Sequence, residues 1–279
     1  MITVSIKVSK MEQLSNLQAV ILCGGQGTRI RSVTEKRPKP LIDIGGKPIL
    51  WHIMKTYSFY GVRSFVLCLG YKGEMIVDYF ENYHSRNHDF TMKINDKEQK
   101  KFHYNGCKCE DSDVDDWEIT FAHTGEETMT GGRLKRIEKH IDTDRFFCTY
   151  GDGLSDLDLR ELYSTHIQSG KTATLTGVHL PTTFGVVETT EDGTVTSFRE
   201  KPSLAGVING GYFVFEKEIF DYIEGDATVL EDRPFRILVR DSKIGMFKHE
   251  GFWHCMDTYK DYESLNTMWK KRKAPWRIW

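Results

Sequence analysis

The sequence predicts an α/β fold, in which a mainly parallel, Rossmann-like sheet has helices on both faces and a smaller strand-rich part is attached. Two observations support this prediction. Apolar runs suited to buried strands alternate with helical segments along the first half of the chain. In the second half, short strand-like runs flank Asp192-Gly193, which is a hairpin signal. In an open parallel sheet, ligands bind beyond the carboxyl ends of the strands.

The length of the chain indicates its domain organisation, and its net charge excludes some classes of partner. A chain of 279 residues can bury a large core. We expect one domain over residues 17–279, with halves at 17–155 and 156–279, and a tail or subunit contact at residues 1–16. A net charge of -2 provides no broad cationic face, so we expect neither nucleic acid nor a membrane as a partner.

The sequence also suggests a compartment. Residues 1–14 are interrupted by Lys7, Lys10 and Glu12, and we find no apolar run with the length of a membrane span or signal segment. The six cysteines lie mostly in apolar segments, which favours reduced thiols over disulfides. We therefore expect a cytoplasmic protein.

A glycine-rich loop follows the first apolar run. Gly24, Gly25 and Gly27 have no Cβ atoms, so several backbone N–H groups can approach one anion closely. Thr28 adds a hydroxyl donor and Arg29 adds a planar cation. The loop is therefore a candidate site for a chain of phosphates.

Two common glycine motifs do not fit this loop. The dinucleotide pattern G-x-G-x-x-G would need glycine at Ile30, and the P-loop pattern would need lysine where Thr28 stands. Ten residues after Arg29, Lys39 lies between Pro38 and Pro40. The combination is thus neither a dinucleotide site nor a P-loop.

The next segments continue the alternation of strand and helix. Residues 49–57 repeat apolar side chains at helical spacing after Pro48, so we interpret Trp51 and His52 as packing residues. Residues 64–69, 89–94 and 118–122 read as strands, and residues 74–83 as a helix. This order favours the parallel sheet.

Residues 95–117 interrupt the alternation with many charged side chains. His103, Cys107 and Cys109 allow a metal site, but C-x-C with one histidine lacks the usual paired spacing. We favour a mobile excursion that serves as a lid or subunit contact.

Two further positions are candidates for phosphate and metal binding. Glycines precede a helix that we place near Gly132, so Thr130, free N–H groups and Arg133 could meet an anion or a base edge there. Asp152 lies between glycines at the end of a strand at residues 145–150, which suggests a metal ligand.

The other acidic candidates have structural alternatives. Asp156 and Asp158 open the next helix, where acids favour the positive end of the dipole, and we interpret them as structural. Further strands are predicted at residues 172–178 and 244–248. Asp257 precedes a final helix at residues 259–269 and is either a metal ligand or an N-cap.

Together these motifs resemble the sugar-1-phosphate nucleotidyltransferases, whose signature is Gly-Gly-x-Gly-Thr-Arg followed by Pro-Lys-Pro. Within that family the chain is similar to the glucose-1-phosphate cytidylyltransferase group, from about Leu17 to its last residue. The closer similarity is carried by Gly-Lys-Pro-Ile-Leu-Trp-His-Ile-Met at 46–54, Met-Thr-Gly-Gly-Arg at 129–133, Tyr-Gly-Asp-Gly at 150–153 and Met-Asp-Thr at 256–258.

The resemblance implies a nucleotidyltransferase, GT-A-like fold, with residues 17–155 binding the nucleotide and residues 156–279 the sugar phosphate. It implies Mg²⁺ as the cofactor, held by Asp152 and Asp257. The implied catalytic residues are Arg29, Lys39, Asp152 and Lys201. The implied CTP-binding residues are Leu22, Cys23, Gly24, Gly25, Gln26, Gly27, Thr28, Arg29, Lys39, Thr128, Arg133 and Gly151, and those facing the sugar phosphate are Glu200, Lys201, Asn209 and Gly210.

The implied reaction transfers a cytidylyl group from CTP to α-D-glucose 1-phosphate, giving CDP-glucose and pyrophosphate for deoxysugar or O-antigen-type polysaccharide synthesis. The family is known for oligomers, often hexamers, so a homo-oligomer is expected.

Residues 30–37 look more like uridylyl- and thymidylyltransferases, so UTP, dTTP or another sugar 1-phosphate stays open. A metal-dependent glycosyltransferase is a more remote alternative, because it would not require the loop and Pro-Lys-Pro together. A non-catalytic paralogue would be expected to lack Arg29 or an aspartate, and the chain has them.

Overall fold

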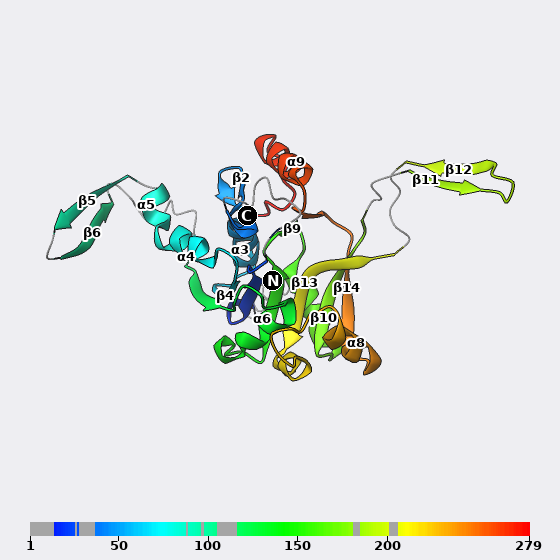
Figure 1. Ribbon diagram of the computed structural model, residues 1–279, viewed down its shortest axis with the longest axis horizontal. Coiled ribbons are helices and arrows are strands. Elements are labelled where there is room, and N and C mark those ends of the chain that lie inside the picture. Colours follow the sequence, from blue (N-terminus) through cyan, green and yellow to red (C-terminus); the bar gives the residue numbers. More distant parts are fainter. Residues whose placement is uncertain are drawn as a thin grey trace, which may run out of the picture.

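The centre of the molecule is a seven-stranded sheet, seen in a computed structural model that describes residues 14–25, 27, 37–87, 89–95, 98–104, 116–180, 185–200 and 206–279 (Figure 1). The strands lie in the order β14 (Ile244–His249), β10 (Ala173–Val178), β13 (Ile208–Glu216), β8 (Arg145–Tyr150), β1 (Gln18–Leu22), β4 (Ser64–Leu69) and β7 (Glu118–His123).

The sheet is mainly parallel. Strand β1 pairs in parallel with β4 and β8, and the β4–β7 and β10–β14 pairs are parallel too. Strand β13 is the exception, because it runs antiparallel to both β8 and β10. The predicted fold class is confirmed.

Helices cover both faces of this sheet. Alternate residues of β1 enter two separate cores, with Ala19 and Ile21 in one and Val20 and Leu22 in the other. The first core contains residues of α3 (Ile49–Phe59), α4 (Gly73–Glu81), α7 (Leu159–Ser169) and α9 (Tyr259–Lys270). The second contains residues of α6 (Thr130–Arg136), α8 (Arg233–Arg240) and the 3₁₀ helix η5 (Lys217–Tyr222). Burial on both faces explains why β1 is apolar at consecutive positions.

Shorter elements make up the rest of the secondary structure in the described ranges. The 3₁₀ helices η2 (Lys39–Leu41) and η4 (Glu138–His140) and the short helix α5 (Tyr83–Asn87) join larger elements. Four two-stranded ribbons pair β2 (Asp43–Ile44) with β3 (Lys47–Pro48), β5 (Phe90–Asn95) with β6 (Glu98–Tyr104), β9 (Gly153–Ser155) with β15 (Trp253–Cys255), and β11 (Val186–Thr189) with β12 (Val195–Arg199).

Two of these ribbons bear on the sequence predictions. The hairpin around Asp192-Gly193 is confirmed as β11 and β12. No strand is predicted from the sequence at Glu98–Tyr104, but this segment pairs with β5 as an antiparallel strand. The role of residues 95–117 as a mobile lid or subunit contact stays a prediction. Both hairpins stand off from the sheet on opposite sides of the molecule (Figure 1). Cys107 and Cys109 lie outside the described residues, as do residues 1–13 of the expected tail.

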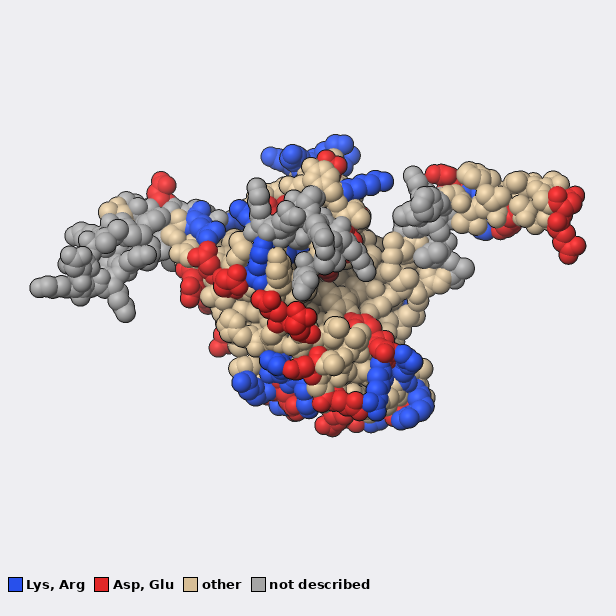
Figure 2. Space-filling view, in the orientation of Figure 1, with Lys and Arg blue, Asp and Glu red and all other residues tan. Residues whose placement is uncertain are grey.

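Charges on the surface are matched locally. On α8, Arg236 pairs with Asp232 and Arg240 with Asp241, and Arg136 of α6 pairs with Asp226. Figure 2 shows Lys and Arg beside Asp and Glu over the lower part of one face. Among the described residues, no helix combines the length and apolar character that crossing a membrane requires.

His52 lies in the first core, as predicted for a packing residue. Its Nε2 atom donates to the carbonyl of Ile44 at 2.8 Å, while its Nδ1 atom accepts from the indole N–H of Trp276 at 3.4 Å. This arrangement requires a neutral ring, because a second proton on Nδ1 would face the indole donor. Burial lowers the pKa of His52 to about 4.

We predict that this histidine makes the protein less stable in mild acid. His52 binds a proton with a pKa near 6.5 in the unfolded chain and only near 4 in the folded chain. Its full contribution to the unfolding free energy is therefore present above pH 6.5 and is lost as the pH falls from 6.5 to 4. Lowering the pH from 7 to 5 should cost about 2 kcal/mol of unfolding free energy through this residue.

The measurement is urea unfolding at both pH values for the wild type, His52→Phe and the control His123→Gln, whose side chain is exposed. The pH-dependent loss should shrink in His52→Phe only. An equal loss in all three proteins would contradict the prediction.

Candidate functional site

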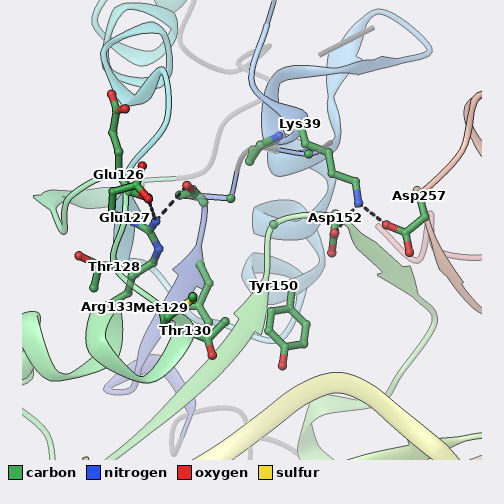
Figure 3. Close-up of a pocket in the computed structure, with 17 residues that line it drawn as sticks. Lys39, Glu126, Glu127, Thr128, Met129, Thr130, Arg133, Tyr150, Asp152 and Asp257 are labelled. Atoms are coloured by element: carbon green, nitrogen blue, oxygen red, sulfur yellow. Dashed lines mark hydrogen bonds and ion pairs between the residues drawn. The ribbon is translucent and has the colours of Figure 1, made fainter. Parts of the chain in front are cut away.

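A pocket of about 480 Å³ opens at the carboxyl ends of β1 and β8 (Figure 3). Sites of this size suit a small-molecule ligand. The pocket is lined by Leu22, Cys23, Gly24, Gly25, Gly27, Lys39, Pro40, Glu126, Glu127, Thr128, Met129, Thr130, Arg133, Tyr150, Gly151, Asp152 and Asp257.

The strand register brings the first glycine loop to Asp152. Leu22 and Tyr150, the last residues of β1 and β8, lie opposite each other in the parallel pair. The N–H of Gly151 donates to the carbonyl of Leu22 at 3.1 Å, and a side chain at Gly151 would crowd Pro40. Gly27 has a φ of 60°, which favours glycine at this turn. The loop and Asp152 therefore share one edge of the sheet.

A separate ribbon brings Asp257 to Asp152. Asp152 precedes β9 and Asp257 follows β15, and the two strands pair antiparallel with Gly153 opposite Cys255. The N–H of Met256 also donates to the carbonyl of Asp152 at 2.9 Å. One oxygen from each carboxylate and the thiol of Cys255 lie within 4.8 Å of one another. The two aspartates thus converge as the metal hypothesis requires.

Lys39 lies between these carboxylates (Figure 3). Its Nζ atom donates to Asp152 at 2.7 Å and to Asp257 at 2.6 Å, and only 9% of the residue is exposed. Burial by itself lowers the pKa of the Lys39 ammonium, but the charge of Asp152 and the hydrogen bonds to both aspartates raise it above its usual value. The lysine is held at this point by η2, which begins between the two prolines.

The residues fit a hard divalent cation. Two carboxylate oxygens already converge on one positive charge, the Lys39 ammonium, which serves as a stand-in for an ion. Carboxylate oxygens are preferred ligands of Mg²⁺. The thiol of Cys255 is a softer group, and its pKa is raised by burial and by the charge of Asp152, so it remains protonated.

The alternative that Asp257 caps the last helix is wrong. Thr258 is the N-cap of α9 and forms a reciprocal capping box with Asp261. The structural interpretation of Asp158 is confirmed, because its side chain caps α7 by accepting from the N–H of Arg160. The side chain of Asp257 is thereby left to face Lys39.

Arg133 lines the pocket, but its guanidinium is turned toward the protein. It donates to backbone carbonyls of Gly24, Leu69, Gly125 and Glu126 at 2.6–3.3 Å, and to the Thr124 hydroxyl at 2.9 Å. Only 5% of the residue is exposed. Its contacts are thus with loops that form the pocket wall.

The start of α6 is also engaged by protein groups. The N–H of Gly132 donates to the carbonyl of Thr228, and the Thr130 hydroxyl donates to Glu231 at 2.7 Å. The expectation that Thr130 and free N–H groups there meet an anion is therefore not supported by these contacts. Thr128, in contrast, lies before the helix and lines the pocket.

Tyr150 and Glu231 are site residues that sequence reasoning missed. The Tyr150 hydroxyl donates to Glu231, and burial followed by the Glu231 charge raises the pKa of that hydroxyl. Glu231 accepts hydrogen bonds from both Tyr150 and Thr130, so it links two residues that line the pocket. The sequence signal that could have identified Tyr150 as a pocket residue is its position at a strand end, directly before Gly151 and Asp152.

Three of the residues expected to face the sugar phosphate, Glu200, Asn209 and Gly210, are described, and none of them is among the residues that line the pocket. Asn209 and Gly210 follow Ile208, the first residue of β13, and the Asn209 side chain accepts from the N–H of Gly211 at 2.9 Å. The carbonyl of Gly210 accepts from the indole of Trp253 in β15 at 2.6 Å. Glu200 follows β12, and its side chain is exposed.

Four residues of the predicted site lie outside the described part of the chain, namely Gln26, Thr28, Arg29 and Lys201. Their roles stay predictions. Cys23, Cys68 and Cys148 are free and buried, and burial raises the pKa of each thiol. These three are reduced core residues, as expected.

Comparison with known proteins identifies the family. The model of the nucleotidyl transferase family matches residues 18–267, which include both aspartates and the glycine loop. The chain belongs to this family. The family resemblance inferred from the motifs is confirmed.

Individual relatives support a closer relationship within the nucleotidyl transferases. The probable glucose-1-phosphate cytidylyltransferase of Bacillus subtilis (strain 168) is 43% identical over 264 residues, covering 94% of this chain and 100% of the relative. Glucose-1-phosphate cytidylyltransferase of Salmonella typhi is 43% identical over 265 residues, with the same coverage. The crystal structure of HddC from Yersinia pseudotuberculosis shares the fold, with a TM-score of 0.64, 24% identity, and coverage of 91% of this chain and 99% of that one.

We predict that Lys39→Met makes the stability of this transferase depend on divalent metal. Without the ammonium, the carboxylates of Asp152 and Asp257 repel each other, which should cost on the order of 1 kcal/mol for this partly exposed pair. Mg²⁺ should restore the loss, because it replaces the missing positive charge.

Thermal unfolding in EDTA and in excess Mg²⁺ tests this prediction. Lys39→Met should gain more from Mg²⁺ than the wild type or the control Lys248→Met, whose side chain pairs with Glu250 at the surface. Equal gains in all three proteins would show that Lys39 does not occupy the metal position.

Proposed function

We propose that this protein transfers the cytidylyl group of CTP to α-D-glucose 1-phosphate, releasing pyrophosphate and CDP-glucose. The observation that carries the proposal is the similarity to glucose-1-phosphate cytidylyltransferases over their whole length. The pocket supports it, because glycine-loop residues, a lysine and two aspartates meet there. CDP-glucose made in this way would supply deoxysugar or O-antigen-type polysaccharide synthesis in the cytoplasm.

The chemistry requires no general base. An oxygen of the sugar 1-phosphate attacks the α-phosphorus of CTP, a new P–O bond forms, and the bond to the bridging oxygen of pyrophosphate breaks. That nucleophile is anionic at neutral pH, so the site has no proton to remove. The barrier is instead electrostatic, because two polyanions must approach while charge builds on the leaving group.

Lys39 is the described cation best placed to lower this barrier. Its ammonium already lies at the pocket, and its raised pKa keeps it charged at neutral pH. We propose that it contacts the nucleotide phosphates when CTP is bound. Arg29 is proposed to stabilise the departing pyrophosphate and Lys201 to neutralise the incoming sugar phosphate.

Asp152 and Asp257 are the residues that would hold Mg²⁺. Bound there, Mg²⁺ would supply Lewis-acid neutralisation of phosphate charge. The carboxylates themselves fix the point at which positive charge is held, now occupied by the Lys39 ammonium, and this restricts where the reacting phosphates can lie.

The remaining assignments follow the family resemblance. We propose that Leu22, Cys23, Gly24, Gly25, Gln26, Gly27, Thr28, Thr128 and Gly151 bind CTP. Glu200, Lys201, Asn209 and Gly210 are proposed to bind the sugar phosphate. One contact supports the placement of Gly210 near the reacting groups. Its carbonyl accepts a hydrogen bond from Trp253, which lies in β15, the strand that precedes Asp257.

The choice of base and sugar gives the central test. Pyrophosphate release should be fastest with CTP and glucose 1-phosphate, with a kcat/KM at least about tenfold above that with UTP, dTTP or GTP, because a site with acceptors for the cytosine amine leaves them unpaired when uracil enters. Mannose 1-phosphate should be the poorer acceptor.

The control is Asp152→Asn, which should lose activity with every substrate pair while remaining folded by circular dichroism. Faster turnover with UTP or dTTP would replace the cytidylyl assignment by one of the alternatives. No turnover with any triphosphate would overturn the proposal.

We also propose that the protein is a homo-oligomer, a hexamer by its family resemblance. The β11–β12 hairpin supports this, because an isolated two-stranded ribbon is marginally stable in water. It also exposes Val187, Val195 and Phe198 by 49%, 59% and 63%. A second copy of the chain would cover these side chains.

Light scattering after size exclusion tests this proposal. The wild type should elute as an oligomer, and Phe198→Glu should shift it toward smaller species, because a charge would be buried against the neighbour. Val239→Glu is the matched control, since Val239 on α8 is also 63% exposed. A monomeric wild type, or equal shifts in both variants, would contradict it.

A further inference from the structure

A thiol lies beside the two aspartates of the pocket. Cys255 is the last residue of β15 and pairs with Gly153 of β9, the residue directly after Asp152. Its Sγ atom, one oxygen of Asp152 and one oxygen of Asp257 all lie within 4.8 Å of one another. Across the ranges that the structure describes, no other three His, Cys, Asp or Glu side chains come together in this way.

The strand aims this thiol toward the carboxylates. His254, the preceding residue, lies 3.2 Å from the Asp261 carboxylate of α9, and successive residues of a strand point to opposite sides. Cys255 therefore points away from α9. Met256, the following residue, is fully buried in the first core, while Asp257 lines the pocket. Cys255 and Asp257 thus stay on the pocket side of the chain.

The three atoms are near enough to share one metal ion. Ligand atoms at 2.0–2.3 Å from a tetrahedral ion lie about 3.5 Å from one another. Small side-chain rotations, which bring the atoms inward by roughly 1 Å, would therefore complete the site. Three protein ligands leave the fourth position of a tetrahedral ion to water.

This set of ligand atoms differs from the one that Mg²⁺ requires. Carboxylate oxygens suit Mg²⁺, and that ion gains nothing from a thiol. Zn²⁺ binds carboxylate oxygen and cysteine sulfur alike, so two oxygens and one sulfur match it. Cys255 therefore adds a preference for ions that bond strongly to sulfur, which we call thiophilic ions.

Lys39 competes for the same position. Its ammonium donates to Asp152 at 2.7 Å and to Asp257 at 2.6 Å, so an ion bound by both carboxylates must displace it. A divalent ion brings twice the charge of the ammonium and a bond to the sulfur as well. Of the two divalent ions, only a thiophilic one gains from the sulfur.

We propose that Cys255 is a third metal ligand, which lets this site hold a thiophilic divalent cation of the Zn²⁺ class in competition with Mg²⁺. As the metal–sulfur bond forms, the S–H bond breaks and its proton passes to solvent. The bound ion occupies both aspartates, so it inhibits the transfer reaction. Only this inhibition rests on the proposed function, since ion binding requires no substrate.

The test removes two other cysteines first. Cys107 and Cys109 lie outside the described residues and are themselves candidate metal ligands, so every protein tested carries Cys107→Ser and Cys109→Ser. The metal-stripped proteins are titrated with cadmium chloride, without substrate, and the ultraviolet thiolate-to-cadmium absorption is recorded. The parent protein should develop this absorption up to one equivalent of Cd²⁺, because one site holds the three ligands.

Cys255→Ser separates the two classes of ion. It should lose the absorption and bind Zn²⁺ at least about tenfold more weakly, while its affinity for Mg²⁺ stays within about threefold of the parent's. Cys23→Ser is the matched control and should keep the absorption, because Cys23 lines the same pocket but lies outside the group of three. Lys39→Met should bind Zn²⁺ more tightly, because the ammonium no longer competes.

Kinetics then test the inhibition. In excess Mg²⁺, Cys255→Ser should need at least about tenfold more Zn²⁺ than the parent for the same loss of pyrophosphate release. Equal inhibition of the two proteins would contradict the proposal. If the parent shows the cadmium absorption but no turnover with any triphosphate, the proposed function fails and the metal assignment stands.

Three results of the titrations would overturn the assignment of Cys255. They are an undiminished absorption in Cys255→Ser, an equal loss of Zn²⁺ and Mg²⁺ affinity in that variant, and unchanged Zn²⁺ binding by Lys39→Met. X-ray absorption of the zinc-loaded parent covers the case in which Cys255→Ser does not fold. One sulfur should appear about 2.3 Å from the metal, and a shell of oxygen and nitrogen alone would refute the proposal.

Discussion

The ammonium of Lys39 between the carboxylates of Asp152 and Asp257 is the interaction on which the site depends. Two aspartates this close repel each other unless a cation lies between them. The β9–β15 ribbon holds the aspartates together, and the turn between Pro38 and Pro40 brings the lysine to them. One ammonium and two carboxylates are thus held close together beside the glycine loop. Charged groups fixed in place in this way are what stabilises the charge that develops in a reaction of phosphates.

A second buried cation organises the other wall of the pocket. Lys39 faces side-chain carboxylates, whereas Arg133 faces backbone carbonyls, and Figure 3 shows them on opposite sides of the pocket. Strand ends leave carbonyls without partners, and a planar group with five donors can satisfy several at once. The two cations therefore hold different parts of the pocket: Lys39 joins two carboxylates, and Arg133 joins the ends of β1, β4 and β7 through backbone carbonyls.

Periodicity and turn chemistry in the sequence predicted most of the fold. Residues 64–69 and 145–150 are strands with the predicted bounds, since buried strands in a parallel sheet are apolar throughout. The strand Glu98–Tyr104 was missed, because charged residues mask the alternation there. Glu231 was missed for another reason: it lies far along the chain from Tyr150 and Thr130, and nothing local marks it as their partner.

The sequence by itself determined the family, the glycine loop, the lysine between prolines and the aspartate between glycines, because each is a local pattern with a local physical cause. Tertiary structure alone decided that Asp257 meets Asp152, that Thr258 and not Asp257 caps the last helix, and that Arg133 turns inward. These outcomes depend on strand pairing and on carbonyls from separate loops. Such contacts join residues that are distant in sequence, so no window of the chain contains them.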